Sequence, residues 1–294
     1  MFNKRIINLI FKNMSTITGD NTVLVDKIGG ITTIAINRPK QRNCINSVTA
    51  KMLEEAITNF ENDDGSFAAV LYGTGGNFCS GFDLNEIEGQ CDSNTYINHS
   101  ILASRKSIKK PMVAALNGYT VAGGLELALL CDLRVMEETA ILGLYGRRFG
   151  VPLVDGGTVR LPAIIGLSRA LDLILTGRSV TAKEAFEWGM INRIVACGTS
   201  LGQAMQLATC LKKFPQECLR SDRDSTYNAA FLQAYNDILK YEKQNASKVP
   251  IKKMIEGAKK FFTGIGKHGK FYDLTEKRIS DWEKEYSQTA KSKL

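Results

Sequence analysis

The sequence predicts a mixed α/β domain followed by a helical C-terminal region. Short runs of β-branched and apolar residues alternate with stretches of helical periodicity up to about residue 198, and glycines stand where several runs end. From about residue 199 the periodicity is almost entirely helical. We therefore expect a candidate leader over residues 1–14, an α/β core over residues 15–198 and a helical region over residues 199–294.

The N-terminal part of the core begins with two strands. Val23–Lys27 and Ile31–Asn37 are β-rich runs separated by Gly29-Gly30, which predicts a hairpin. Ser47–Phe60 has apolar residues at helical spacing, with Ser47 as the expected cap. Ala68–Tyr72 is a continuous apolar run, as expected for a buried strand.

The order of strand, turn and helix then recurs toward the C-terminus. We expect strands at Met112–Leu116, Leu133–Val135 and Ile141–Leu144, and helices at Thr95–Ile108, Gly124–Cys131, Thr158–Leu161, Ser168–Leu175 and Ala182–Trp188. Four further helices are expected over residues 199–213, 215–244, 250–263 and 275–288.

Composition narrows the class of protein. Of the 294 residues 44% are hydrophobic and 23% charged, which is ordinary for a globular enzyme, and no apolar run approaches the roughly 20 residues that span a bilayer. The seven cysteines form no CxxC pair, and only His99 and His268 could join them as ligands. We therefore expect no membrane association, no metal site and reduced thiols.

The net charge of +8 is concentrated at the two ends of the chain. Three basic residues in 1–13 and two in 291–294 leave the rest of the chain with only three of the eight net charges. A mild excess suits a phosphate-bearing ligand, whereas nucleic-acid binding is not expected.

Both ends also resemble targeting signals. The tripeptide Ser292-Lys293-Leu294 predicts binding to the peroxisomal import receptor. Residues 1–12 are basic, free of acids and partly apolar, like a mitochondrial presequence, but a start at Met14 would remove them. We expect the peroxisome, with the mitochondrion as the alternative.

Two segments carry most of the chemical information. In Phe78–Leu84 and again in Asn117–Leu127, glycines stand where an apolar strand gives way to a helical stretch. Backbone N–H groups at a helix start lack acceptors in the helix, and two of them aimed at one point make an oxyanion hole. Glu126 follows in the second segment. This combination can stabilise an enolate and move a proton beside it.

At these residues the chain resembles the crotonase (enoyl-CoA hydratase/isomerase) family, from about Val23 to about Val195. The resemblance implies a spiral of ββα repeats, with C-terminal helices that cover the active site or mediate assembly into a homotrimer or hexamer. It also implies an acyl-CoA thioester as substrate and no tightly bound cofactor. The oxyanion donors would be the backbone N–H groups of Phe82 and Gly123, and Glu126 would be the first catalytic glutamate. Gly81 and Gly124 would permit the tight backbone path.

The second catalytic glutamate of hydratases is missing. An ungapped match over 140–161 places Gly146 at that position. Asp155 is the nearest replacement carboxylate; it could pair with Glu126 in acid–base catalysis, or it could cap the following helix or bind an arginine. Arg147 and Arg148 could narrow the pocket, or they could form surface or inter-subunit pairs.

The resemblance also indicates where coenzyme A would bind. The expected contacts come from the loop after the second strand and from the backbone of the first oxyanion segment: Lys40, Arg42, Cys44, Ser80, Gly81, Asp83 and Leu84. Lysine and arginine suit the phosphates on charge grounds. The segment Phe261–Lys270 could add basic contacts near the nucleotide.

The leading hypothesis is therefore an enoyl-CoA hydratase-type enzyme of fatty-acid β-oxidation, using the oxyanion hole and Glu126. The first alternative is an enoyl-CoA or dienoyl-CoA isomerase that uses Asp155. The second is a non-catalytic protein that binds acyl-CoA or RNA.

Overall fold

The computed structural model describes residues 21–88, 107–231, 240, 244, 247 and 250–264. The expected leader, the Ser292-Lys293-Leu294 tripeptide, His268, the helix expected at 275–288 and nearly all of the helix expected at 95–108 lie outside these residues.

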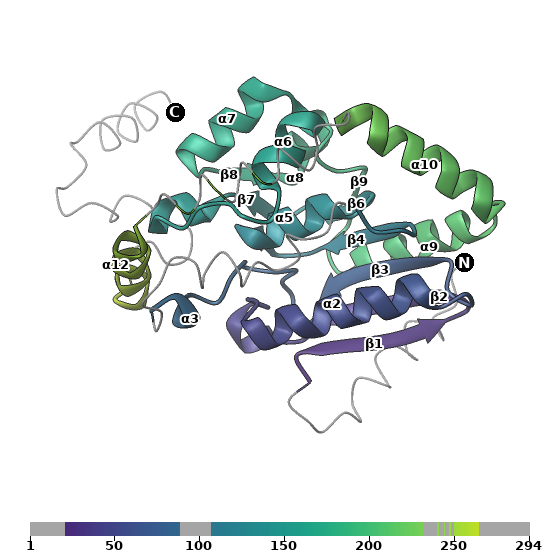
Figure 1. The fold of residues 1–294 in the computed structure, drawn as a ribbon, viewed down its shortest axis with the longest axis horizontal. Coiled ribbons are helices and arrows are strands. Elements are labelled where there is room, and N and C mark those ends of the chain that lie inside the picture. Colours follow the sequence, from purple (N-terminus) through teal and green to yellow (C-terminus); the bar gives the residue numbers. More distant parts are fainter. Residues whose placement is uncertain are drawn as a thin grey trace, which may run out of the picture.

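A six-stranded sheet forms the centre of the fold (Figure 1). Its strands are β1 (Val23–Ile28), β2 (Ile31–Ile36), β3 (Ala68–Gly73), β4 (Met112–Leu116), β6 (Leu133–Glu137) and β9 (Arg193–Val195), in the order β1-β2-β3-β4-β6-β9. β1 and β2 form the expected antiparallel hairpin, and all other neighbours in this sheet are parallel. Because β3 and β4 are adjacent and parallel, the loops that follow them leave the sheet at the same edge.

A smaller sheet lies beside the first. It consists of β5 (Tyr119–Val121), β7 (Ile141–Gly143) and β8 (Ser179–Thr181), in the order β5-β7-β8. Of its three strands the sequence predicts only β7, and it also misses β9 of the large sheet.

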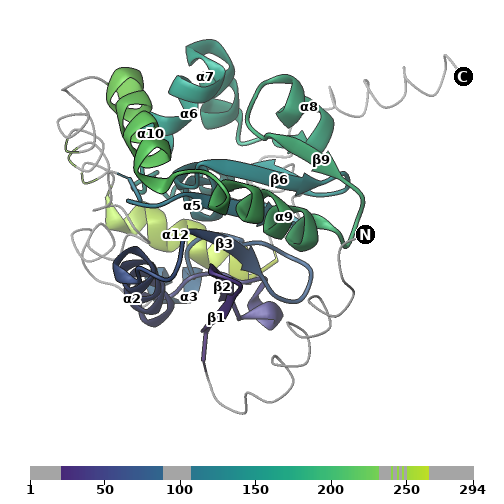
Figure 2. The same ribbon diagram turned by 90° about the vertical axis from the view of Figure 1, so that its right-hand side faces the viewer.

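Helices pack on both faces of the large sheet. The helices of the described residues are α2 (Ser47–Asn62), α3 (Leu84–Glu88), α5 (Gly123–Leu130), α6 (Gly157–Ile165), α7 (Leu167–Thr176), α8 (Ala182–Glu187), α9 (Ser200–Lys212), α10 (Gln216–Phe231) and α12 (Ile251–Phe262). Figure 2 shows α9 along one face of the sheet. There Ala204, Met205 and Ala208 pack on Val70 and Val113, whereas Leu71 and Ala114 belong to the core on the opposite face. Strands buried on both faces explain the continuous apolar runs in the sequence.

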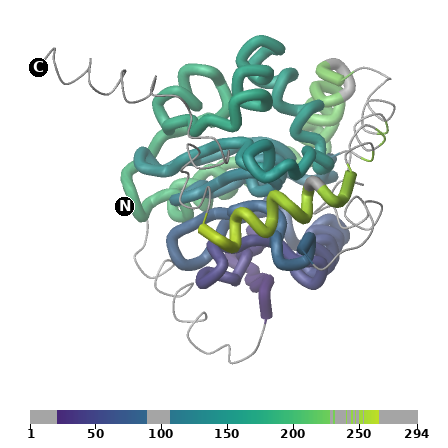
Figure 3. The backbone as a smooth tube through the Cα atoms, turned by 90° about the vertical axis from the view of Figure 1, so that its left-hand side faces the viewer, coloured from purple at the N-terminus to yellow at the C-terminus, as the bar shows by residue number. Residues whose placement is uncertain are grey.

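Helix α12 lies across the side of the molecule between the N-terminal and the middle elements (Figure 3). Its Met254 and Ala258 are buried against Ile87 of α3 and Val154. Gly257 lies so close to the backbone of Phe149 that a Cβ there would overlap the Phe149 carbonyl. This contact brings the end of α12 to the candidate active site.

Candidate active site

The two oxyanion segments of the sequence run side by side in the structure. The backbone N–H groups of Phe78 and Cys79 donate to the carbonyls of Asn117 and Tyr119 at 2.8 and 3.0 Å, and Val121 N–H donates back to Cys79 at 3.0 Å. These bonds continue the parallel pairing of β3 and β4 beyond the ends of both strands. The sheet topology therefore brings together two segments that lie far apart in the sequence.

The predicted donors meet where these segments end. Gly81 has a φ of +93°, and a Cβ built on it would lie 2.8 Å from the Cβ of Ala122 and 3.0 Å from the backbone nitrogen of Gly123. Gly123 is the first residue of α5, where N–H groups have no acceptor within the helix. A glycine is required at position 81 both for its φ and for this close approach.

The direction in which the Phe82 N–H points follows from the geometry of the peptide bond between Gly81 and Phe82. The carbonyl of Gly81 belongs to the same peptide and accepts a 2.8 Å hydrogen bond from Ile45 N–H. A trans peptide is planar, so its N–H and C=O point in opposite directions. The Phe82 N–H therefore points away from Ile45.

Glu126 is the charged residue of α5 and is only 3% exposed. Its Oε1 accepts hydrogen bonds from the backbone N–H groups of Asp155 and Gly157, at 3.1 and 2.8 Å. Gly157 has no space for a side chain, since a Cβ there would lie 2.8 Å from this Oε1. The carboxylate of Glu126 is thus fixed in orientation by the turn that begins α6.

The structure places Asp155 and Gly146 at the same cavity as Glu126. Asp155 is 8% exposed, and its backbone carbonyl accepts a 2.6 Å bond from Arg160 Nη1. Gly146 lies in the 3₁₀ helix Tyr145–Phe149, and a Cβ on it would approach the Val151 carbonyl to 2.9 Å. A glutamate could therefore not simply be restored at position 146 without a shift of this turn.

Arg147 and Arg148 are directed toward the end of α7. Arg147 Nε donates to the Ile174 carbonyl at 3.3 Å. Arg148 donates to the Gly177 carbonyl at 2.6 and 3.0 Å and lies over the Tyr145 ring. Neither side chain lines the cavity.

The cavity itself has a volume of about 420 Å³. Every predicted site residue except Gly81 lines it: Lys40, Arg42, Cys44, Ser80, Phe82, Asp83, Leu84, Gly123, Glu126 and Asp155. Gly81 lies directly behind, between Phe82 and Ala122. The structure therefore brings the proposed catalytic and coenzyme A residues to one place.

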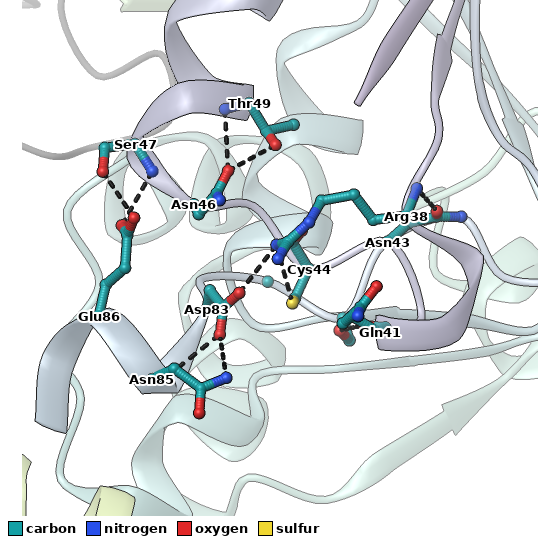
Figure 4. Close-up of polar contacts among 12 residues, drawn as sticks. Arg38, Gln41, Asn43, Cys44, Asn46, Ser47, Thr49, Asp83, Asn85 and Glu86 are labelled. Carbon is teal, nitrogen blue, oxygen red and sulfur yellow. Dashed lines mark hydrogen bonds and ion pairs between the residues drawn. The ribbon is translucent and has the colours of Figure 1, made fainter. Parts of the chain in front are cut away.

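Two of the proposed coenzyme A residues carry side chains that are held by the protein. The carboxylate of Asp83 forms a 2.8 Å ion pair with Arg38 and accepts hydrogen bonds from Asn85 (Figure 4). Burial and the neighbouring Asp83 raise the pKa of the Cys44 thiol well above its ordinary value. Lys40 is exposed, whereas Arg42 is half-buried and lies over the Tyr119 ring. Of these four residues, Lys40 and Arg42 are suited to phosphates.

The sequence does not reveal the apolar wall of the cavity. Phe149 and Phe261 pack edge to face with ring centroids 5.3 Å apart, and Phe262 and Tyr119 also line the cavity. Phe261 reaches the site only because α12 docks on the Tyr145–Phe149 turn, which no local pattern indicates. The Phe261-Phe262 pair at the end of an amphipathic stretch was the available signal.

Within the part of the chain that the structure describes, no helix is both long and apolar enough to cross a membrane. The same residues contain no cluster of three or more His, Cys, Asp or Glu side chains able to hold a metal ion.

Comparison with known proteins identifies the family. The family model for enoyl-CoA hydratase/isomerase matches residues 26–283. The chain belongs to the enoyl-CoA hydratase/isomerase family. It is similar to the enoyl-CoA hydratase EchA19 of Mycobacterium tuberculosis, with 31% identity over 223 residues, which covers 72% of this chain and 84% of the relative. It is also similar to the mevalonyl-coenzyme A hydratase sidH of Aspergillus fumigatus, with 32% identity over 191 residues, 64% of this chain and 71% of the relative.

Solved structures agree with this assignment. An enoyl-CoA hydratase from Mycobacterium smegmatis has a TM-score of 0.69 at 29% identity and covers 78% of this chain and 98% of its own. An enoyl-CoA hydratase/isomerase from Xanthobacter autotrophicus Py2 has a TM-score of 0.74 at 25% identity, over 85% and 94% of the two chains. The fold is thus the crotonase fold of this family, and the chain is an enzyme of the hydratase/isomerase class.

Proposed function

We propose that this enzyme hydrates enoyl-CoA thioesters in fatty-acid β-oxidation, with Glu126 as its acid–base residue. One observation carries the proposal. A buried carboxylate, fixed by two backbone N–H groups, lines the same cavity as both oxyanion donors. This is the arrangement that addition of water across a double bond conjugated to a thioester requires.

The reaction would proceed with the thioester carbonyl accepting hydrogen bonds from Phe82 and Gly123 N–H. Glu126 takes a proton from a water molecule while the water oxygen bonds to the β-carbon, and the π electrons move onto the thioester oxygen as an enolate. The α-carbon then receives a proton from the Glu126 carboxyl group, which yields the 3-hydroxyacyl thioester. One oxyanion donor typically contributes about 10²–10³ in rate.

Coenzyme A would enter past Lys40 and Arg42, whose charges suit its phosphates. Cys44, Ser80 and Leu84 line the cavity between these cations and the oxyanion donors, where the pantetheine chain would pass. The substrate brings coenzyme A with it, so the proposal includes no resident cofactor.

Isomerisation of the double bond is the second candidate, because the cavity contains a second carboxylate at Asp155 and none at position 146. The cavity has no carboxylate at Gly146, while Asp155 is buried and lines it together with Glu126. An isomerase needs one group to remove a proton from the α-carbon of a 3-enoyl thioester and one to return a proton to the γ-carbon. Glu126 and Asp155 could divide these two steps.

The test compares two substrates. Crotonyl-CoA loses its ultraviolet absorbance when it is hydrated, whereas 3-hexenoyl-CoA gains absorbance when its double bond moves into conjugation. Hydration that is lost in Glu126→Gln and largely kept in Asp155→Asn would support the proposal. Isomerisation alone, lost in both variants, would favour the second candidate. Coenzyme A thioester binding or RNA retention without turnover of either substrate would contradict both and indicate a binding protein.

A further inference from the structure

The guanidinium of Arg38 links the loop that contains Cys44 to the segment that contains Asp83 (Figure 4). Its Nη1 lies 2.8 Å from Asp83 Oδ2, and it donates to the Cys44 carbonyl at 2.7 Å and to the Cys44 thiol at 3.3 Å. The two charged side chains are only 15% and 7% exposed. An ion pair so far removed from water is strongly sensitive to the loss of one partner.

These contacts surround the peptide that carries one of the oxyanion donors. On one side of Phe82, the Gly81 carbonyl accepts from Ile45 N–H; on the other, Asp83 N–H donates to the Ile45 carbonyl at 2.9 Å. Arg38 binds the residue before Ile45 and the carboxylate after Phe82. The two backbone bonds to Ile45 hold the Phe82 peptide, and the Arg38 side-chain bridge adds a second link between the same two segments.

Arg38 is itself held firmly. Its backbone N–H donates to Asn43 Oδ1 at 2.8 Å. The amide nitrogen of Asn43, which is fully buried, donates to the carbonyls of Thr74 and Asn77 in the turn after β3. The backbone of Arg38 is thus anchored to the turn after β3, and its side chain extends from this fixed point to Cys44 and Asp83.

Charge gives Arg38 a second effect. Asp83 directly follows an oxyanion donor, and an uncompensated carboxylate there would oppose the negative charge that develops on the thioester oxygen. The Arg38 guanidinium cancels this charge. The neutral thiol of Cys44 adds none, because burial and Asp83 hold its pKa well above the ordinary value.

We propose that Arg38 is a positioning residue of this enzyme: through Cys44 and Asp83 it fixes the Phe82 N–H and neutralises the carboxylate beside it. Arg38 does not line the cavity, so it would act on the transition state without touching the substrate. The inference rests on the proposed function only in taking Phe82 as an oxyanion donor.

The first experiment measures the crotonyl-CoA kinetics of Arg38→Met, Arg38→Lys and the double variant Arg38→Met/Asp83→Asn. For Arg38→Met we expect kcat to fall about 10- to 100-fold, less than the loss of a whole donor, with KM changed less than about threefold. The double variant should regain part of kcat, because no uncompensated carboxylate remains. Arg38→Lys keeps the charge on a shorter side chain without the planar guanidinium, so we expect an intermediate kcat, and it serves as the test if the Met variant does not fold.

The second experiment needs no turnover. A dimethylamino-substituted cinnamoyl-CoA has an absorbance band that moves to longer wavelength when its carbonyl is polarised. The wild-type enzyme should shift this band on binding, and Arg38→Met should shift it less at saturating ligand. Absence of the shift in the wild type would overturn the proposed function and this inference with it. Equal shifts and equal kcat in wild type and Arg38→Met would overturn the inference alone.

The matched control is Arg223→Met. Arg223 Nε forms a 2.7 Å ion pair with Asp132, and the two side chains are 9% and 15% exposed, so the pair is buried to the same degree but lies away from the cavity. Its loss should lower the unfolding midpoint as Arg38→Met does while leaving kcat and the band shift unchanged. If both variants changed only the unfolding midpoint, Arg38 would have a purely structural role, contrary to the inference.

Discussion

The two oxyanion segments border the same cavity but are held in place by different forces. The segment around Gly123 begins helix α5, in which every residue from Gly124 to Leu130 is buried. The segment around Phe82 is a loop, held by backbone bonds to Ile45 and by the Arg38–Asp83 ion pair. Both segments have backbone hydrogen bonds, but the close packing of a buried helix is added on the Gly123 side and a buried ion pair on the Phe82 side.

The difference has consequences for how each donor responds to change. Packing at the start of α5 is close: a Cβ on Gly124 would overlap the carbonyl oxygen of Cys79. Protein interiors deform little, so disturbance there is costly. The polar support of Phe82 can be weakened in steps, by removing a charge or by protonating a carboxylate. We therefore expect stability and kcat to fall sharply when the packing around Gly123 is disturbed. They should fall in smaller steps when the polar contacts of the Phe82 segment are removed.

The largest effect should come from Gly124→Ala. The added methyl group must push α5 away from Cys79, which we expect to cost about 1–3 kcal/mol in the free energy of unfolding. Since Gly123 N–H moves with the helix start, kcat should fall by about 10²-fold, as for loss of a donor. Urea unfolding and crotonyl-CoA hydration measure the two quantities. A variant with normal stability and kcat would show that the contact between the two segments is not tight.

A smaller and opposite effect on stability is expected for Ala122→Gly. Ala122 has a φ of 52° and a ψ of −128°, a conformation that glycine adopts far more easily. Relief of this strain should stabilise the fold by about 1 kcal/mol. The Ala122 methyl group also packs on Gly81, so its removal should loosen the donor geometry and lower kcat by about threefold. A gain in both stability and kcat would mean that the strained alanine has no role in the site.

The same comparison explains how far the sequence could predict the site. Phe82, Gly123 and Glu126 could be predicted together because each lies in a local motif that resembles the crotonase family. In the structure the parallel strands β3 and β4 bring these motifs to one edge of the sheet. Arg38 lies outside both motifs. Its contact with Asp83 joins residues distant in the sequence, and charge pairing between loops leaves no periodic signal.

The fold shows the same limit. The sequence predicts the longer strands and helices of the core, since continuous apolar runs and helical spacing are visible over five or more residues. It misses β5 although Tyr119–Val121 lies within the second motif, because there the glycines on both sides indicate a turn. Packing of α12 over Phe149 depends on the course of the chain after α10, which spacing cannot specify.

The smallest expected effect is a pH dependence of stability, which should be present for the ion pair beside Phe82 and absent for the packed segment around Gly123. Burial by itself would raise the pKa of Asp83, but hydrogen bonds from Arg38 and Asn85 outweigh it and hold the pKa below the usual value. A carboxyl whose pKa is depressed by folding stabilises the native state above its unfolded pKa, and this contribution is lost as pH falls through the folded pKa. The stability difference between wild type and Arg38→Met should therefore be constant from about pH 5 to 8 and shrink below about pH 4.

The segment around Gly123 provides the control for this pH dependence. Gly124 contacts Cys79, whose pKa burial raises to about 12, so its thiol stays neutral throughout this pH range. The stability difference between wild type and Gly124→Ala should then not vary with pH, and urea unfolding at several pH values measures both differences. If the stability difference between wild type and Arg38→Met also stayed constant down to pH 3, the Arg38 side chain would stabilise the Phe82 segment by packing and not by its charge.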